Sequence, residues 1–263
     1  MPQKAQKGND PHDESPVPDS HVIVPSLLLE QTLSFLSHDL FGPMSMLRTY
    51  LQAVSEQRPG ADEVGQMLED AVGMAVQLEG LAGVLRDSVR LLLDRLPVAP
   101  MSIDLFHFLQ EWTRKNAAVE WRSPPAEYRP VDCRVQVDRD ILGRALEYAA
   151  WQMARMGARR GNVGVTVRKG EGTWEIVLSR TDARLEEGVL ARALDDHEPD
   201  QLSFLRRLPA SGYPLRVSRG LVEAMGGNVR IGGEEAGCGN LAISFACAGR
   251  SRSLASGTKD EAG

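Results

Sequence analysis

The sequence predicts an α+β protein: a helical hairpin that dimerises into a four-helix bundle, followed by an α/β sandwich. Three observations predict this fold class. Apolar residues recur at helical spacing over 26–57 and at heptad spacing over 62–95. Pro59 and Gly60 interrupt the helical pattern between the two segments. After residue 101, short apolar segments typical of strands lie between helical ones, which indicates a mixed domain.

The heptad pattern of the second helix bears on the oligomeric state. One line of the seam contains Val64, Ala71, Leu78, Leu85 and Leu92, and the line beside it contains Leu68, Ala75, Ala82 and Val89. A lone hairpin of this length cannot bury two apolar stripes, whereas two hairpins packed together form a four-helix bundle. Because we find only one such hairpin in the sequence, we expect the second to come from another copy. The predicted assembly is a homodimer.

Composition divides the chain into four parts. Pro97 and Pro100 mark a linker between the hairpin and the mixed domain. The expected parts are a disordered tail at 1–24, the hairpin at 25–96, the α/β domain at 101–249 and a second disordered tail at 250–263. Within the α/β domain we expect helices at 103–116, 139–157, 187–207 and 214–225, and strands at 119–122, 132–137, 162–169, 173–179, 228–232 and 240–247.

Charge and composition exclude several classes of function. The formal net charge is −6, from 30 basic and 36 acidic residues, whereas nucleic-acid binding favours a basic surface. No apolar run approaches the roughly 18 residues of a membrane span, and the N-terminus lacks the apolar region of a secretory signal. Three cysteines without metal-type spacing argue against a zinc site and a disulfide framework. We therefore expect a cytoplasmic protein with no bound metal of its own and no nucleic-acid or membrane partner.

His38 is the main candidate for chemistry. The apolar stripe of its helix centres near Leu36 and Leu40, which turns His38 toward solvent. An exposed imidazole can act as a nucleophile, and Asp39 can hydrogen-bond one ring nitrogen or act as a base while the other nitrogen attacks. Pro43 removes a backbone donor one turn later and favours a local kink. The position alone leaves open the alternative of a solvated surface histidine.

The segment SFLSHDLFGPMSMLRTYLQAV resembles the H-box of histidine kinases. In that family the phosphate-accepting histidine is followed by an acidic residue and Leu, with Pro at the fifth place; here these are His38, Asp39, Leu40 and Pro43. With Gly42, the pattern HDLxGP is closer to single-function histidine phosphotransferases of the ChpT type. The resemblance covers roughly residues 26–248 and includes the ATP-binding domain of the family. It implies partner docking around this turn, on Phe41, Gly42, Pro43 and Ser45.

The same resemblance implies a nucleotide site whose family residues are replaced. The two Asn places of the helix that binds Mg²⁺ fall on Tyr148 and Gln152, and the extra methylene of Gln makes ligation doubtful. The Asp that accepts from the adenine amino group is replaced by Arg180, which has donors only. The two glycines of that turn fall on Asp182 and Arg184.

The glycine-rich box of the family is also degraded. Gly212 alone is retained there, and Pro214 stands at a glycine place. All three nucleotide boxes have therefore lost the residues that the family uses, so we expect no ATP binding and no cofactor.

We therefore predict a histidine phosphotransferase that exchanges a phosphoryl group with receiver domains of response regulators through His38, the receiver supplying Mg²⁺. Two alternatives stay open: an atypical histidine kinase without a sensor domain that autophosphorylates His38 from ATP, and a non-catalytic scaffold that docks response regulators.

Overall fold

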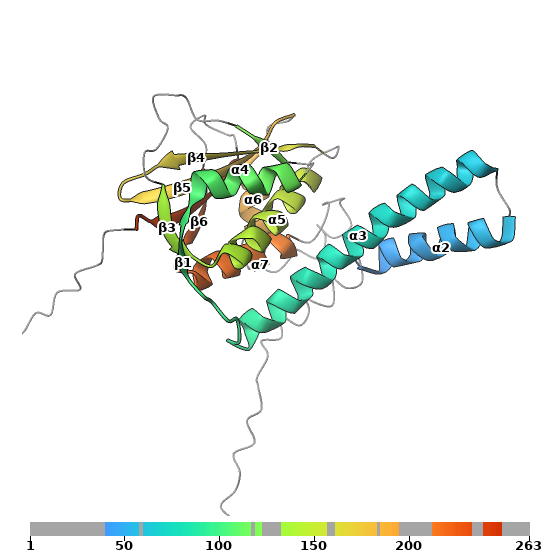
Figure 1. Cartoon of the computed structure of the whole chain (residues 1–263), viewed down its shortest axis with the longest axis horizontal. Helices are drawn as coiled ribbons and strands as arrows, with labels where there is room; N and C mark the ends of the chain where they lie inside the picture. Colours follow the sequence, from blue (N-terminus) through green and yellow to red (C-terminus); the bar gives the residue numbers. More distant parts are fainter. Residues whose placement is uncertain are drawn as a thin grey trace, which may run out of the picture.

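A computed structural model of the chain describes residues 40–57, 60–116, 119–122, 133–156, 161–182, 185–194, 212–232 and 239–248. It shows a long helical hairpin whose second helix leads into an α/β domain (Figure 1). The predicted fold class is confirmed. His38, Asp39, Arg184 and both expected tails lie outside the described residues.

The hairpin consists of α2, Phe41–Gln57, and α3, Ala61–Leu92, which pack side by side over part of their length (Figure 1). Charges at the two ends of α3 complement its dipole, with Asp62 and Glu63 in the first turn and Arg90 in the last. The C-terminal half of α3 continues past α2 along the α/β domain (Figure 1). Among the described residues, no helix combines the length and apolarity needed to cross a membrane.

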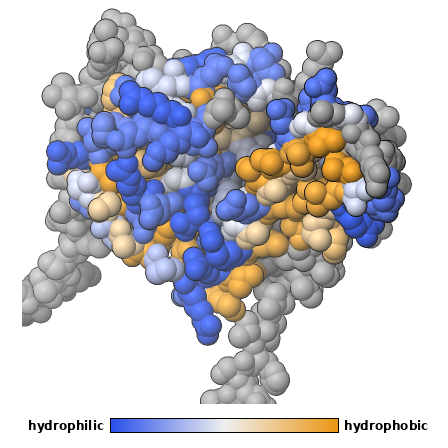
Figure 2. Space-filling view, turned by 45° about the vertical axis from the view of Figure 1, so that its right-hand side comes forward, coloured by the Kyte–Doolittle hydropathy of each residue, from blue (hydrophilic) through white to orange (hydrophobic). Residues whose placement is uncertain are grey.

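The two heptad lines of α3 differ in burial. In the first line Ala71 is buried, and Val64, Leu78 and Leu85 are half-buried. In the second line Leu68 and Val89 are exposed, and Val72 beside it is 63% exposed. Figure 2 shows a broad apolar patch on the side of the molecule where the hairpin lies. Leu92, the last residue of the first line, is exposed. One chain therefore covers the first apolar line in part and leaves the second line open to solvent.

The α/β domain is built on a five-stranded sheet of order β2-β4-β5-β7-β6. Its strands are β2 Val119–Trp121, β4 Val163–Lys169, β5 Thr173–Arg180, β7 Leu241–Ala246 and β6 Asn228–Ile231. Strand β2 pairs with β4 in parallel, and the other neighbours are antiparallel. A second sheet pairs β1, Met101–Asp104, with β3, Arg134–Val137.

Four helices complete the domain: α4 Leu105–Lys115, α5 Arg139–Arg155, α6 Glu187–Leu194 and α7 Tyr213–Ala224. Helices α5 and α7 pack against each other and cover one face of the large sheet (Figure 1). Alternate residues of β5 point into this layer, and Ile176 and Leu178 are fully buried there. The core thus lies between the sheet and the α5–α7 pair.

The turn glycines support the predicted elements. The strands expected at 162–169 and 173–179 are confirmed, since β4 and β5 pair antiparallel, and Gly172 in the turn between them has a positive φ of 73°. Gly226, at φ 76°, ends α7 as expected for a helix C-cap.

One predicted helix requires correction. The helix expected at 103–116 begins only at Leu105, and its first residues belong to β1. The strand is short and pairs with β3, which is distant in sequence, so local periodicity did not reveal it. Asp104 ends the strand and caps α4 by accepting a hydrogen bond from the His107 backbone N–H. Of the helix expected at 187–207, the structure describes α6, Glu187–Leu194, and residues 195–207 lie outside the described residues.

Candidate functional site

The residues that follow His38 and Asp39 form an exposed turn at the start of α2. Phe41 is 57% exposed, Gly42 and Ser45 are exposed, and Pro43 is half-buried. Leu40 has π-helical geometry, and the described α-helix begins at Phe41, two residues before Pro43. A large aromatic side chain and a glycine thus face solvent directly after the candidate phosphate acceptor.

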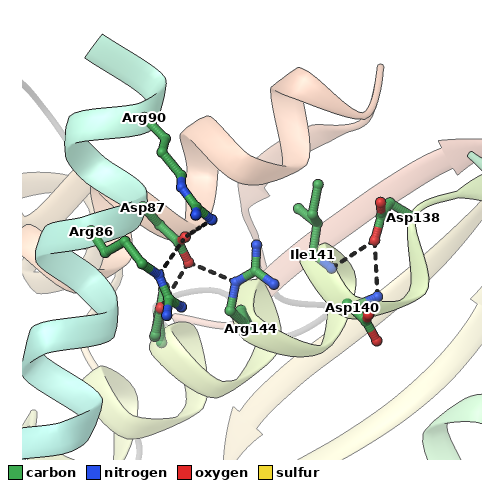
Figure 3. A network of polar contacts seen from close by, with 8 residues as sticks. Arg86, Asp87, Arg90, Asp138, Asp140, Ile141 and Arg144 are labelled. Atoms are coloured by element: carbon green, nitrogen blue, oxygen red, sulfur yellow. Dashed lines mark hydrogen bonds and ion pairs between the residues drawn. The ribbon is translucent and has the colours of Figure 1, made fainter. Parts of the chain in front are cut away.

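Helix α5 carries the two places where the family resemblance puts metal-binding Asn residues. Its N-terminus is fixed by Asp138, whose carboxylate accepts from the backbone N–H groups of Asp140 and Ile141 at 3.0 Å (Figure 3). Asp138 also accepts from the Ala99 N–H of the linker at 2.9 Å. Burial opposes ionisation of this group, but the three donors lower the pKa of Asp138. The Asp138 carboxylate therefore connects the linker to the start of α5.

Tyr148 on α5 faces α3. Its hydroxyl donates a hydrogen bond to Oδ2 of Asp87 at 2.9 Å, and Arg144 donates its Nε–H to the same oxygen at 2.7 Å. Asp87 has no solvent exposure. Its other oxygen, Oδ1, lies 3.6 Å from Arg86 Nε and 3.9 Å from an Arg90 guanidinium nitrogen (Figure 3). Burial and the neighbouring Asp87 carboxylate raise the pKa of Tyr148, which keeps its proton on the donor.

A second polar contact joins α3 to α7. The hydroxyls of Ser88 and Tyr213 lie 2.5 Å apart, and both side chains are buried. Three residues later on α3, Leu91 lies over Gly220 of α7, where an added Cβ would approach its Cδ1 to 2.9 Å. Tyr148, at the first Asn place, therefore belongs to a contact between the hairpin and the α/β domain.

Gln152 lies one turn after Tyr148, at the second Asn place. Its side chain is fully buried, yet neither its amide oxygen nor its amide nitrogen has a hydrogen-bond partner among the described residues. A buried carboxamide without hydrogen-bond partners lowers the stability of the fold. Gln152 is therefore an unsatisfied polar group within the helix layer. No group of three or more His, Cys, Asp or Glu side chains that could hold a metal occurs in the described ranges.

Arg180, at the adenine-binding Asp place, forms an ion pair within its own turn. Its Nε and Nη2 donate to the two carboxylate oxygens of Asp182 at 2.9 and 2.6 Å, a bidentate arrangement. Its Nη1 donates to the backbone carbonyl of Met156, just after α5. The Arg180 side chain is only 2% exposed. Asp182, at a glycine place of the family, is thus the partner of the arginine that replaces the family's Asp.

Gly212, the retained glycine, has a structural role in this chain. It begins α7 with a left-handed φ of 60°, and an added Cβ would lie 2.7 Å from the backbone oxygen of Ala193 at the end of α6. Arg216 and Arg219 of α7 donate to the Ala193 and Leu194 carbonyls at 3.3 and 3.0 Å. The start of α7 and the end of α6 are therefore in direct contact.

Sequence reasoning placed Tyr148, Gln152, Arg180, Asp182 and Gly212 but missed their partners. Asp87, Arg144 and Tyr213 carry no motif, and each becomes recognisable only when α3 lies on α5 and α7. Arg180 and Asp182 are an exception. Side chains two residues apart along a strand lie on the same side of the backbone, and Arg180 and Asp182 carry opposite charges at the end of a strand. The sequence alone therefore indicated their ion pair.

Comparisons with known proteins bear on the fold. No family model matches the sequence, and no curated protein matches it significantly. Among solved structures, a chain of histidine kinase AdeS from Acinetobacter baumannii matches with a TM-score of 0.54 at 15% identity, over 80% of this chain and 98% of the solved chain. A chain of histidine kinase ThkA, solved in complex with the response regulator protein TrrA, matches with a TM-score of 0.56 at 11% identity, over 88% of this chain and 69% of the solved chain. The chain has the fold of a histidine kinase core, with a dimerisation-type hairpin and an ATP-binding-type domain.

Proposed function

We propose that this protein is a histidine phosphotransferase of a two-component phosphorelay, similar to the ChpT type, that works through His38 without binding ATP. The observation that carries the proposal is that the side chains at the nucleotide places are engaged elsewhere. Tyr148 binds Asp87 of the hairpin, and Arg180 binds Asp182 and the Met156 carbonyl. A kinase needs these places for metal and adenine, whereas a phosphotransferase does not.

The proposed reaction uses few groups of this chain. The unprotonated ring nitrogen of His38 attacks the phosphorus of a receiver phospho-aspartate; the P–N bond forms as the P–O bond breaks, and the aspartate leaves as a carboxylate. Asp39 hydrogen-bonds the other ring N–H and stabilises the positive charge that develops on the ring. Transfer to a second receiver reverses these steps. Mg²⁺ comes from the receiver, so catalysis here is positioning and charge stabilisation.

The exposed turn after His38 supports receiver docking. Phe41, Gly42 and Ser45 are open to solvent in the single chain, and Pro43 is half-buried between them. The fold likeness to ThkA, which was solved with a response regulator, agrees with a partner of this class. A receiver that docks on this turn contacts the residues that directly follow His38 and Asp39 in the sequence.

The proposal includes a homodimer, and the burial of α3 supports it. Leu68, Val72, Val76 and Val89 form an exposed apolar face on one helix. Exposed apolar patches of this extent mark interaction surfaces, and a second hairpin would cover this one in a four-helix bundle.

One labelling experiment tests the function. The full chain is incubated with labelled ATP and Mg²⁺, and separately with a receiver domain phosphorylated on its aspartate. We expect label from the receiver and none from ATP, with the transfer lost in His38→Ala. Labelling from ATP would show a kinase instead. No labelling of His38 from any phosphorylated receiver of the source organism, together with receiver binding, would show a docking scaffold.

Gln152 favours one alternative, an atypical kinase. A buried carboxamide without described partners stands at a place that binds Mg²⁺ in the resembled family. If Gln152 holds Mg²⁺–nucleotide, calorimetry with Mg²⁺–ADP will detect binding to the full chain, and Gln152→Leu will abolish it. We expect no binding by either protein.

A further inference from the structure

The contact between α3 and α5 is built around a buried charge. We call the three side chains Asp87, Arg144 and Tyr148 the clasp. Both donors of the clasp reach the same oxygen of Asp87, and they come from positions 57 and 61 residues away in sequence. Asp87 is fully buried, and Arg144 is 25% exposed. A buried carboxylate is stable only while its partners stay in place, because breaking such a pair leaves a desolvated charge.

Glycines on both sides of the contact allow close packing around the clasp. A Cβ added at Gly83, one turn before Asp87 on α3, would lie 2.9 Å from the Tyr148 hydroxyl oxygen. A Cβ at Gly220 of α7 would collide in the same way with Leu91 of α3. Each side of the contact thus supplies a glycine opposite a large side chain of the other. Leu81 and Val84 on the same part of α3 are 1% exposed and join the core of the α/β domain.

These features distinguish the contact from an ordinary one between domains. Interfaces between domains are generally polar and permit relative motion. This one combines buried apolar residues, a buried ion pair with two donors on one oxygen, and the Ser88–Tyr213 bond on its far side. Within this contact Tyr148 of α5 is only 6% exposed.

We infer that the clasp locks the hairpin and the α/β domain into one rigid body. In this arrangement the domain cannot swing along the hairpin, and the Tyr148 hydroxyl stays bound to Asp87 until the clasp opens. The inference does not depend on whether His38 carries a phosphoryl group, since it rests on α3, α5 and α7 alone.

Two glycines of α3 give a matched test. Gly83→Ala and Gly80→Ala raise helix propensity equally, but an added Cβ at Gly80 meets nothing within 4 Å. Only Gly83→Ala pushes on Tyr148. ¹⁵N relaxation of the full chain gives separate tumbling times for α3 and for strands β4 and β5. We expect one shared time in the wild type and in Gly80→Ala, and a shorter time for the strands than for α3 in Gly83→Ala.

Two conservative variants keep the test decisive if Gly83→Ala alters the fold. Tyr148→Phe removes one donor, and Asp87→Asn removes the charge, while both preserve shape. Each is expected to separate the two tumbling times, whereas Arg48→Gln, at an exposed position of α2 outside the clasp, leaves them equal. A single shared tumbling time in Gly83→Ala, Tyr148→Phe and Asp87→Asn would overturn the inference. So would separate times in the wild type.

Discussion

The hydroxyl of Tyr148 on α5 donates a 2.9 Å hydrogen bond to the carboxylate of Asp87 on α3, across 61 residues of sequence. This bond joins the helical hairpin to the α/β domain at the place where histidine kinases, by resemblance, carry a metal-binding Asn. One side chain therefore accounts for two features of the molecule: how the two parts are attached and why this place is not free for a metal.

Removing the Tyr148 hydroxyl should lower stability. Tyr148→Phe leaves Asp87 buried with Arg144 as its remaining close donor, and the loss of a hydrogen bond to a buried charge costs about 1.5–3 kcal/mol. Urea denaturation of the full chain measures the change in the free energy of unfolding. The control is Tyr50→Phe on α2, at a half-buried position outside the clasp. Equal effects of the two substitutions would show that the Asp87 bond contributes nothing specific.

Alkaline pH should destabilise the protein through the same side chain. Burial and the Asp87 carboxylate raise the pKa of Tyr148 above its ordinary value of 10.0. Above pH 10 the unfolded chain releases a proton that the native state retains, so this contribution to stability is present below pH 10 and is lost as pH rises. Unfolding measured at pH 9 and pH 11 should therefore show a larger loss in the wild type than in Tyr148→Phe. A parallel loss in both proteins would contradict the assignment.

Arg180 should be required for stability, not for nucleotide binding. Arg180→Ala leaves the Met156 carbonyl and Asp182 without their guanidinium donor; because Asp182 is 41% exposed and can be hydrated, we expect a cost of roughly 1–3 kcal/mol. Thermal unfolding measures it, and Arg48→Ala, at an exposed position of α2, should stay within about 0.5 kcal/mol of wild type.

Arg180→Asp restores the carboxylate of the resembled family at this place. It should be less stable than Arg180→Ala, because the new charge faces Asp182, and Mg²⁺–ADP should still fail to bind in calorimetry. Nucleotide binding by Arg180→Asp would show that this single replacement had disabled the site.

Alanine substitutions at Gly212 and Gly226 distinguish the cost of backbone strain from the cost of a steric clash. Both have positive φ, 60° and 76°, so Ala at either position costs about 1–2 kcal/mol for the left-handed conformation. At Gly212 alone, the added Cβ also meets the Ala193 carbonyl at 2.7 Å, whereas nothing lies within 4 Å at Gly226. Gly212→Ala should therefore be the more destabilising in urea titrations. If the two variants match, contact between α6 and α7 does not constrain this turn.

Charge on the exposed face of α3 should disrupt the proposed dimer. Val72 and Val76 are each 63% exposed in the single chain, and Val72→Asp with Val76→Asp places two carboxylates where a second hairpin would pack. Light scattering coupled to size exclusion should report a dimer for the wild type and a monomer for the double variant. Gln66→Asp, an exposed polar position on the same helix, should remain dimeric. A wild-type monomer at micromolar concentration would contradict the dimer.

Local pattern was sufficient wherever an element depends on its own residues. Helix α3 and strands β4 and β5 all lie close to where the sequence places them. Strand β1 was missed because its four residues acquire their conformation from pairing with β3. Asp104 shows the difference within one residue, since its capping role is local and its strand role is not.

The sequence by itself determined the fold class, the candidate His38 and the loss of the family's nucleotide residues, because periodicity, residue chemistry and spacing are properties of the chain. Only the tertiary structure decided what the replacement residues do. The sequence shows that Tyr148 replaces a metal-binding Asn of the resembled family. Its hydrogen bond to Asp87 exists only because α3 lies across α5. A buried charge is stable only with partners, and those partners come from segments that sequence distance separates and folding brings together.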